Sequence, residues 1–320
     1  MPRRAVIDIG TNSVKLLVAE VDVPRVVPVL ECGEQTRLGQ DFYRTHHLTA
    51  PAVARTAATA ARFAARAQAL GASQVSLIAT SAAREARNPE DLRAAVRRAC
   101  GLELAVISGE QEADLAFRGV RSDPRLAGKP LGILDVGGGS TEVVLGGVPP
   151  PVFRRSYALG AVRLLESMAV EDPPTDRSRA QCADLVRACL HEQVESSLGP
   201  ALAALADPAE LVGTGGTASV LGAMQLGLTR FDREALEALD LSLADVERWS
   251  QRLWQLPLAE RQRIPGLPPE RADVILTGVG IYLGMMERFG WRSLRISTRG
   301  LRFGAVLEAE TQPSTRSPDC

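Results

Sequence analysis

Two stretches of the sequence repeat one pattern: AVIDIGTNSVKLLV at residues 5–18 and GILDVGGGSTEVVL at residues 132–145. Each has an apolar run, an aspartate, a glycine, small residues with a serine, and a second apolar run. This order is typical of two strands joined by a tight hairpin. Asp8 aligns with Asp135 and Ser13 with Ser140, whereas Lys15 aligns with Glu142. The repeat therefore predicts two similar halves whose charge is reversed at one position.

Apolar strand-like runs alternate with helical patterns on both sides of these hairpins. Residues 50–71 and 89–101 have helical spacing, and residues 74–80 and 102–108 have the apolar run of a buried strand. This alternation predicts an α/β protein. The polar segment DPRLAGKP, at 123–130, stands directly before the second hairpin. We therefore predict one domain at residues 1–124, a second at 125–310 and a disordered tail at 311–320.

The composition excludes several classes of partner. The formal net charge is −1, so no basic excess predicts nucleic-acid binding. The sequence contains no apolar run of the length that predicts a membrane span, and it begins without a secretory leader pattern. The five cysteines are scattered without zinc-ligand spacing and indicate reduced thiols. We therefore expect a cytoplasmic protein with no membrane or nucleic-acid partner.

The two hairpins are predicted to hold phosphate. Glycines after each aspartate allow backbone N–H groups to approach an anion closely. One isolated hairpin of this kind would be equally typical of an ordinary turn. Two copies in register, each at the head of one half of the chain, favour a shared phosphate site. The predicted phosphate-binding residues of the hairpins are Thr11, Asn12, Ser13, Lys15, Gly137, Gly138, Gly139, Ser140 and Thr141.

A third glycine-rich turn, GTGGTAS at residues 213–219, follows an apolar pair and precedes a helical pattern. The unpaired N–H groups of a helix N-terminus attract anions. The turn does not fit the P-loop pattern and fits the dinucleotide-binding pattern only loosely. We predict that it adds Gly213, Gly215, Gly216 and Thr217 to the phosphate site.

The pattern Asp-x-Gly-x-x-Ser at the head of both halves, with a third glycine turn, resembles the superfamily of actin, hexokinase and heat-shock chaperone ATPases. Within it, four further segments look like the exopolyphosphatase and guanosine pentaphosphate phosphohydrolase family. They are ATSAAREARN at 79–88, ISGEQEADLAFRGV at 107–120, ERADVILTGVGIYLGMMERFG at 270–290 and ISTRGLRFGAVLE at 296–308. The resemblance implies an α/β fold with two ribonuclease-H-like, actin-like ATPase domains and a cleft between them.

The resemblance also assigns roles to side chains. It places the catalytic glutamate at Glu112, which would accept a proton from the attacking water. It places a phosphate-binding arginine at Arg84, and Lys15 stands where the family usually has arginine. Carboxylates that face a polyanion require a cation between them, so Asp8, Asp135 and Glu142 are expected to hold Mg²⁺, or Mn²⁺ in its place. Asp135 and Glu142 are counted as catalytic for this reason, and Glu142 could instead orient the water.

The expected activity is release of terminal orthophosphate from inorganic polyphosphate, with guanosine pentaphosphate as a second substrate. Because the sequence ends soon after the second domain, shorter polyphosphates or an alarmone are favoured. A second copy of the chain is counted among its expected partners. The alternatives are an ATP-dependent small-molecule kinase of the same superfamily and an alarmone-binding sensor without catalysis. The segments ISGEQEA and TSAARE favour the phosphohydrolase over the kinase.

Overall fold

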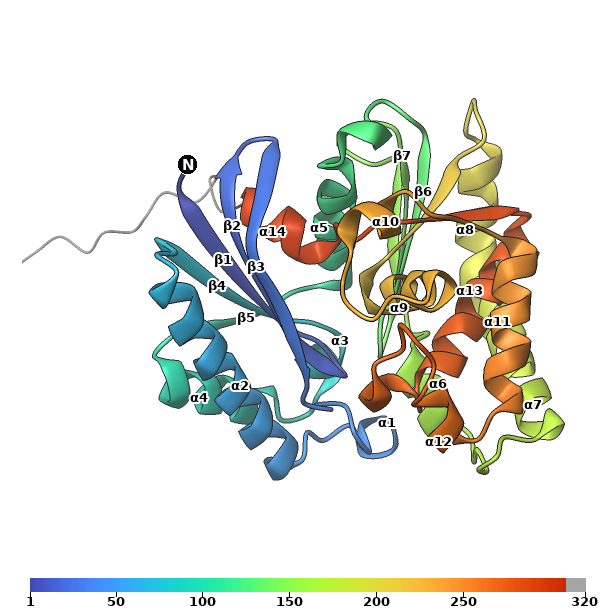
Figure 1. Ribbon diagram of the computed structural model, residues 1–320, viewed down its shortest axis with the longest axis horizontal. Helices are drawn as coiled ribbons and strands as arrows, with labels where there is room; N and C mark the ends of the chain where they lie inside the picture. The colour runs from blue at the N-terminus through green and yellow to red at the C-terminus, as the bar shows by residue number, and fades with distance from the viewer. Residues whose placement is uncertain (309–320) are drawn as a thin grey trace, which may run out of the picture.

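The structure is a computed structural model that describes residues 1–308. The tail predicted at 311–320 lies outside the described residues, as does the end of the second predicted domain. Two β-sheets stand side by side, each covered by helices, and they form the two lobes seen in Figure 1. Among the described residues, no helix is both long and apolar enough to cross a membrane.

The first sheet contains the first of the two repeated hairpins. Its strand order is β3-β2-β1-β4-β5, with β1, β2 and β3 antiparallel and with β4 and β5 parallel to β1. The strands are β1 (Arg3–Ile9), β2 (Ser13–Asp22), β3 (Arg25–Gln35), β4 (Gln74–Ala79) and β5 (Leu104–Val106). The helices of this lobe are α1 (Phe42–Thr45), α2 (Ala50–Ala69), α3 (Ser81–Glu85) and α4 (Pro89–Cys100).

Period-two alternation in β1 gives the first sheet two buried faces. Ala5, Ile7 and Ile9 are buried in one core, with residues of α2 and α4. Val6 points to the opposite face and is buried with Phe303 of another helix. Both faces of this sheet are therefore covered. Asp8, near the end of β1, is held in place by a strand that is packed on both sides.

The second sheet contains the second hairpin and has the order β10-β11-β9-β6-β7-β8. Its strands are β6 (Leu131–Val136), β7 (Thr141–Gly146), β8 (Phe153–Tyr157), β9 (Glu210–Thr214), β10 (Asp240–Ser242) and β11 (Ser293–Ile296). Its helices are α6 (Ala161–Glu166), α7 (Asp176–Cys189), the π-helical turn η2 (Leu190–Val194), α8 (Glu195–Ala203), α9 (Gly215–Leu226), α10 (Arg233–Glu237), α11 (Leu243–Gln255), α12 (Leu258–Arg261), the 3₁₀ turn η3 (Pro269–Arg271) and α13 (Ile275–Phe289). The segment 270–290, which resembles the family, therefore lies partly in the turn η3 and mostly in the separate helix α13.

Two further helices cross between the lobes. Helix α5 (Gly109–Arg121), followed by the turn η1 (Pro124–Leu126), packs on β6, β7 and β8 of the second sheet. Helix α14 (Leu301–Glu308) packs on β1, β2 and β3 of the first sheet. Each of the two helices thus packs on a sheet that comes from the other half of the sequence, and the predicted boundary at 124/125 separates both helices from their sheets.

The crossing point of α5 and α14 is built from backbone contacts. A Cβ atom placed on Gly119 would lie 2.0 Å from the carbonyl oxygen of Gly300. A Cβ atom placed on Gly304 would lie 2.0 Å from the carbonyl oxygen of Leu115. Glycine at these two positions lets the two helices cross at backbone distance.

Candidate active site

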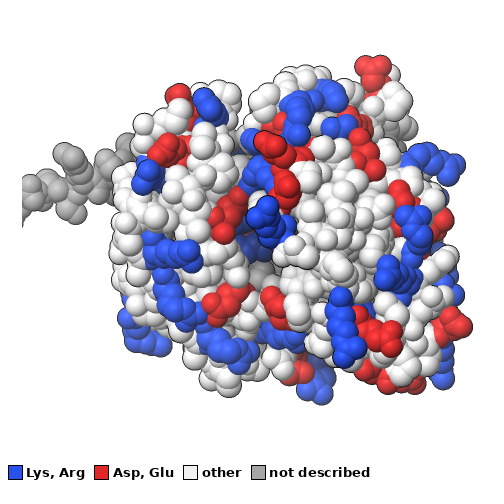
Figure 2. Space-filling view, viewed as in Figure 1, with Lys and Arg blue, Asp and Glu red and all other residues white. Residues whose placement is uncertain are grey.

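A cavity of about 450 Å³ lies between the two hairpins. Lys, Arg, Asp and Glu side chains gather along the furrow between the lobes in Figure 2. The cavity is lined by both hairpins, by the start of α9 and by the catalytic glutamate expected from the sequence. Its lining includes these predicted residues: Asp8, Thr11, Asn12, Ser13, Lys15, Glu112, Asp135, Gly137, Gly138, Gly139, Ser140, Glu142, Gly215, Gly216 and Thr217.

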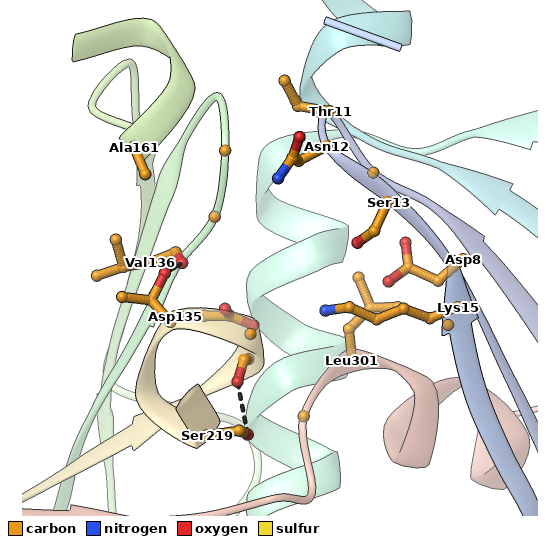
Figure 3. Close-up of a pocket in the computed structure, with 18 of the residues that line it drawn as sticks. Asp8, Thr11, Asn12, Ser13, Lys15, Asp135, Val136, Ala161, Ser219 and Leu301 are labelled. Atoms are coloured by element: carbon orange, nitrogen blue, oxygen red, sulfur yellow. Dashed lines mark hydrogen bonds between the residues drawn. The ribbon is translucent and has the colours of Figure 1, made fainter. Parts of the chain in front are cut away.

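The first hairpin places a carboxylate and an ammonium side by side. Asp8 on β1 pairs with Lys15 on β2 in the antiparallel register. The turn is closed by the N–H of Gly10, which donates to the carbonyl of Ser13 at 2.9 Å. Both side chains extend into the cavity, and Lys15 reaches toward Asp135 on the other lobe (Figure 3). Burial lowers the pKa of Lys15, while the nearby Asp8 opposes that effect.

The second hairpin has the same geometry with a different charge. Asp135 on β6 pairs with Glu142 on β7. The N–H of Gly137 donates to the carbonyl of Ser140 at 2.9 Å, as in the first turn. The repeat read in the sequence is therefore a structural repeat of strand, turn and register. Where the first hairpin presents one negative and one positive group, the second presents two carboxyl groups.

The third glycine turn packs directly on the second hairpin. Gly215 has a φ of 80°, and a Cβ atom there would lie 2.0 Å from Oδ1 of Asp135, so this position requires glycine. The hydroxyl of Thr217 donates to the carbonyl of Val136 at 2.9 Å. The start of α9 is thereby held against the end of β6, with its first turn facing the cavity.

Glu112 is buried at the wall of the cavity on the first turn of α5. The helix begins with a capping box in which the Ser108 hydroxyl accepts from the N–H of Gln111, and the Gln111 side chain accepts from the N–H of Ser108. Nη1 of Arg84 donates to Oε2 of Glu112 at 2.9 Å. Burial raises the pKa of Glu112 well above its usual value, and the charge of Glu142 adds to that rise. A buried carboxyl group with a raised pKa is suited to accept a proton near neutral pH.

The carboxyl groups of the second hairpin are also strongly perturbed. Burial, then the charge of Asp135, raises the pKa of Glu142 to about 7. Burial raises the pKa of Asp135 to about 6, with Lys15 opposing. The Ser156 hydroxyl donates to Oε1 of Glu142 at 2.7 Å and fixes its orientation. The cavity thus concentrates acidic groups that are costly to ionise together without a cation.

The donor set fits a divalent cation only in part. Asp8, Asp135 and Glu142 supply the oxygen ligands that Mg²⁺ and Mn²⁺ prefer. Within residues 1–308, however, no group of three or more His, Cys, Asp or Glu side chains is arranged to hold a metal ion. The expected cage of three carboxylates is therefore not preformed. Mg²⁺ usually binds one or two carboxylates, and substrate phosphates and water complete its shell, so the carboxyl groups present fit that mode.

Three of the predicted phosphate-binding residues lie away from the cleft lining. Gly213 is inside β9, where an added Cβ atom would meet Leu294 and Ala218 of the core. Thr141 is buried, and its hydroxyl donates to the carbonyl of Leu159 at 2.5 Å. Arg84 lines a neighbouring cavity instead, because its guanidinium lies behind Glu112. These positions differ from the expectation because the strand pleat and the ion pair turn the three residues away from the cleft.

Two arginines outside the predicted set of site residues also line the cleft. The guanidinium of Arg271 lies over the third turn, 2.5 Å from where a Cβ atom of Gly216 would be, and it forms no ion pair among residues 1–308. Arg302 of α14 donates to the carbonyl of Leu16 at 2.9 Å and faces the same cavity. Both lie in segments that resemble the family, Arg271 in the segment at 270–290 and Arg302 in the segment at 296–308. Arg299, by contrast, is bonded to Glu237 outside the cleft.

The lobes are tied together at the lower end of the cleft. Nη1 of Arg37 and Oδ2 of Asp273 form an ion pair of 2.8 Å. Arg163 of α6 binds Glu85 of α3 at 2.6 Å, and its guanidinium lies 4.1 Å from the centre of the Tyr43 ring. These partly buried contacts set the spacing of the two hairpins in this structure.

The raised carboxyl pKa values predict how stability changes with pH. Between the ordinary carboxyl pKa and about 7, the folded chain binds more protons at Glu142 than the unfolded chain does. Its free energy of unfolding therefore falls as the pH rises through this window, by roughly 3 kcal/mol for Glu142. We expect Glu142→Gln to raise the thermal midpoint relative to the wild type at pH 8 and much less at pH 5, without divalent cations. An equal difference in thermal midpoint at both pH values would contradict the raised pKa of Glu142.

Comparisons with known proteins agree with this geometry. Residues 17–312 match the Ppx/GppA phosphatase family. The chain is 33% identical over 330 residues to exopolyphosphatase 2 of Mycobacterium tuberculosis, and the alignment covers 96% of this chain and 98% of that protein.

Solved structures also resemble this chain over almost its whole length. The crystal structure of an exopolyphosphatase-like protein superposes with a TM-score of 0.87 at 28% identity, over 96% of this chain and 97% of that one. The Ppx/GppA enzyme of Aquifex aeolicus superposes with a TM-score of 0.76 at 29% identity, over 96% and 99%. The expected fold class, two actin-like ATPase domains flanking a cleft, is confirmed.

Proposed function

Because this chain belongs to the Ppx/GppA phosphatase family, we propose that it releases terminal orthophosphate from inorganic polyphosphate by attack of water in the cleft between its hairpins. Its activity is hydrolysis of phosphoanhydride bonds. The observation that supports the proposal most is the position of Glu112, a buried carboxyl group on the wall of a cavity flanked by two glycine turns. Hydrolysis of a phosphate chain requires a group that accepts a proton from water and donors that position the phosphates, which here are Glu112 and the two glycine turns.

The glycine turns and their polar side chains would hold the end of the chain. Ser13 and Ser140 lie at equivalent places in the two turns, so hydroxyl and N–H donors reach the phosphates from both lobes. Lys15 supplies a positive charge from the first lobe. Asp135 and Glu142 would hold Mg²⁺, which when bound neutralises charge on the phosphates and on the leaving group.

Glu112 would remove a proton from the water as it attacks the terminal phosphorus. The new bond joins the water oxygen to that phosphorus, and the bridging P–O bond breaks. The electrons of the broken bond stay with the shortened chain, and the proton stays on Glu112 until it passes to solvent. Arg84 keeps Glu112 in place through its 2.9 Å hydrogen bond.

A comparison of substrates tests the proposal. Orthophosphate release should be measured with short polyphosphate, long polyphosphate, guanosine pentaphosphate and ATP, each with Mg²⁺ and with Mn²⁺. We expect polyphosphate to give the highest kcat/KM, and the guanosine pentaphosphate arm decides whether the chain has that second activity. Dominant ATP hydrolysis, or phosphoryl transfer to an acceptor without release to water, would overturn the proposal.

The cation can be tested without turnover. Mg²⁺ bound near Asp135 and Glu142 should stabilise their charged forms and raise the thermal midpoint at pH 8. Glu142→Gln should lose most of this increase. An identical Mg²⁺ response in both proteins would place the cation elsewhere.

Lys15 is predicted to contribute to substrate binding through its charge. Replacing it with methionine should lower kcat/KM for polyphosphate by roughly 10- to 100-fold, because a charge-assisted phosphate contact is lost. Lys15→Arg should retain most of the activity. The chain has one other lysine, Lys129, which pairs with Glu210 at 3.3 Å away from the cleft. Lys129→Met is the matched control, and an equal effect of the two methionine variants would contradict the role of Lys15.

A further inference from the structure

The side chain of Arg271 enters the cleft without a bonded partner. Its Nη1 atom lies 2.5 Å from where a Cβ atom of Gly216 would be, over the third glycine turn. Burial lowers the pKa of Arg271, and the charges of Glu270 and Asp273 oppose this effect. Its Nε atom is buried without a hydrogen-bond partner, and it forms no ion pair within the described residues. The direction of the guanidinium therefore depends on the backbone that carries it.

That backbone is the short turn η3, which leads into α13. The N–H of Arg271 donates to the carbonyl of Pro268 at 2.9 Å, and the N–H of Ala272 donates to the carbonyl of Pro269 at 3.3 Å. Hydrogen bonds of this 3₁₀ type have poorer geometry than those of an α-helix. The place of Arg271 over the third glycine turn is therefore sensitive to the contacts that η3 makes with the rest of the molecule.

One side chain of the other lobe binds this turn on both sides of Arg271. Nη2 of Arg37 donates to the carbonyl of Glu270, the residue before Arg271, at 3.2 Å. Nη1 of Arg37 pairs with Oδ2 of Asp273, two residues after Arg271, at 2.8 Å. A planar guanidinium that makes two contacts at once fixes both the distance and the rotation of the group that it binds.

The backbone of Arg37 is bound to the first hairpin. Its N–H donates to the carbonyl of Asn12 at 2.9 Å, and the N–H of Gly39 donates to the carbonyl of Thr11 at 2.7 Å. Arg37 has a φ of 50°, which is uncommon for a residue with a side chain and persists where neighbouring contacts hold it. Arg37 thus connects the turn of the first hairpin directly to the turn that carries Arg271.

We infer that Arg37 is a positioning residue for substrate binding. It holds η3 from the opposite lobe and so keeps the guanidinium of Arg271 over the third glycine turn, where that guanidinium meets the phosphate chain. This inference rests on the proposed function, because it requires a phosphate chain between the hairpins. Arg37 itself lies outside the lining of the cleft and acts on the substrate only through Arg271.

The position of Arg37 separates an effect on binding from an effect on folding. Its side chain is 41% exposed, and exposed ion pairs contribute little to stability. Removal of the guanidinium should therefore leave the fold intact, while η3 loses two contacts with the first lobe. The turnover step should change less than binding does, because Glu112 and its partner Arg84 lie on α5 and α3, away from η3.

The first test separates KM from kcat in the full chain. Arg37→Gln removes both contacts with η3 and should raise KM for polyphosphate by about tenfold, while kcat stays within about twofold of the wild type. Arg37→Lys should be intermediate, because an ammonium can pair with Asp273 but lacks the planar fork that reaches both acceptors. A KM in Arg37→Gln equal to that of the wild type would overturn the inference.

A double-mutant cycle tests whether Arg37 acts through Arg271. Arg271→Gln alone should raise KM by about 10- to 100-fold, because a charge-assisted phosphate contact is lost. Adding Arg37→Gln to Arg271→Gln should then change KM by less than about twofold, since the group that Arg37 positions is already gone. Effects of the two substitutions that simply multiply would mean that Arg37 acts independently of Arg271, and would overturn the inference.

Arg3→Gln is the matched control, because Arg3 makes the same kinds of contact within one lobe. Its side chain is also 41% exposed, pairs with Glu20 at 3.0 Å and donates to the carbonyl of Leu70 at 3.0 Å. Arg3→Gln and Arg37→Gln should have similar thermal midpoints, and KM for polyphosphate should stay within about twofold of the wild type in Arg3→Gln. An equal rise of KM in both variants would mark a general loss of stability and overturn the inference.

Failure of the proposed function would look different, because the wild type would then release no orthophosphate from polyphosphate. The inference is tested apart from turnover by calorimetric titration with a methylene-bridged tripolyphosphate analogue, which water cannot cleave. Arg37→Gln should bind this analogue with a dissociation constant about tenfold above that of the wild type. Equal dissociation constants for the two proteins would overturn the inference, whether or not the wild type hydrolyses polyphosphate.

Discussion

Glu112→Gln is expected to lower kcat for orthophosphate release by about 10³-fold, because the amide cannot accept a proton from the attacking water. The amide oxygen can still accept the hydrogen bond from Arg84, so the wall of the cleft should remain in place. Affinity for polyphosphate should therefore change little. The thermal midpoint at pH 8 should equal or exceed that of the wild type, since a buried carboxylate is replaced by a neutral group.

The test measures kcat and KM in the steady state, together with the equilibrium dissociation constant for polyphosphate. Glu90→Gln is the matched control, because Glu90 is a first-turn glutamate of α4 that is exposed and paired only with Arg93. Retention of more than about a tenth of the wild-type kcat by Glu112→Gln would assign the base to another group. The hairpin geometry and the fold would stand in that case.

Gly119→Val is expected to reduce the free energy of unfolding by at least about 3 kcal/mol, because its side chain would overlap backbone atoms of the other crossing segment. The nearest are the carbonyl oxygen and carbon of Gly300, at 2.0 and 2.7 Å from the Cβ position. Backbone atoms inside a packed crossing cannot rotate away as a side chain can. Denaturant unfolding followed by circular dichroism measures the loss.

Gly280→Ala in α13 is the control for this substitution. It is also a helix-interior glycine, but its added Cβ would meet only the sulfur of Cys182 at 3.5 Å, an ordinary contact. Alanine has the higher helix propensity, so this variant should be as stable as the wild type or slightly more stable. Gly119→Val with wild-type stability would mean that the crossing is looser than the structure describes.

The repeated hairpins could be predicted because their geometry is local. A glycine turn between two apolar strands fixes the register, and the register brings Asp8 beside Lys15 and Asp135 beside Glu142. Successive side chains along a strand point to opposite faces, so Thr141 and Glu142 cannot both face the site. The pleat alone therefore excludes Thr141. To exclude Gly213, one would need to know which face of β9 is covered by α9 and α13, whose Ala218 and Tyr282 lie next to it.

Arg84 and the crossing helices could not be located from the sequence. The place of Arg84 depends on how α3 and α5 meet, because these helices bring its guanidinium behind Glu112 from 28 positions away. The α/β alternation gives the order of elements but does not say which sheet a helix covers. Helix α5 follows the first sheet in sequence, yet its Phe117 is buried with Ile133 and Val144 of the second.

The crossing of α5 and α14 makes the two lobes inseparable as folding units. A cut in the 123–130 segment would leave the first half with α5, whose apolar face belongs to the second sheet, and would leave α14 with the second half. Each fragment would expose one helix face and one sheet face that only the other fragment can cover. Each lobe keeps its own main core, and α5 connects them, because its Leu115 is buried with the first sheet and its Phe117 with the second.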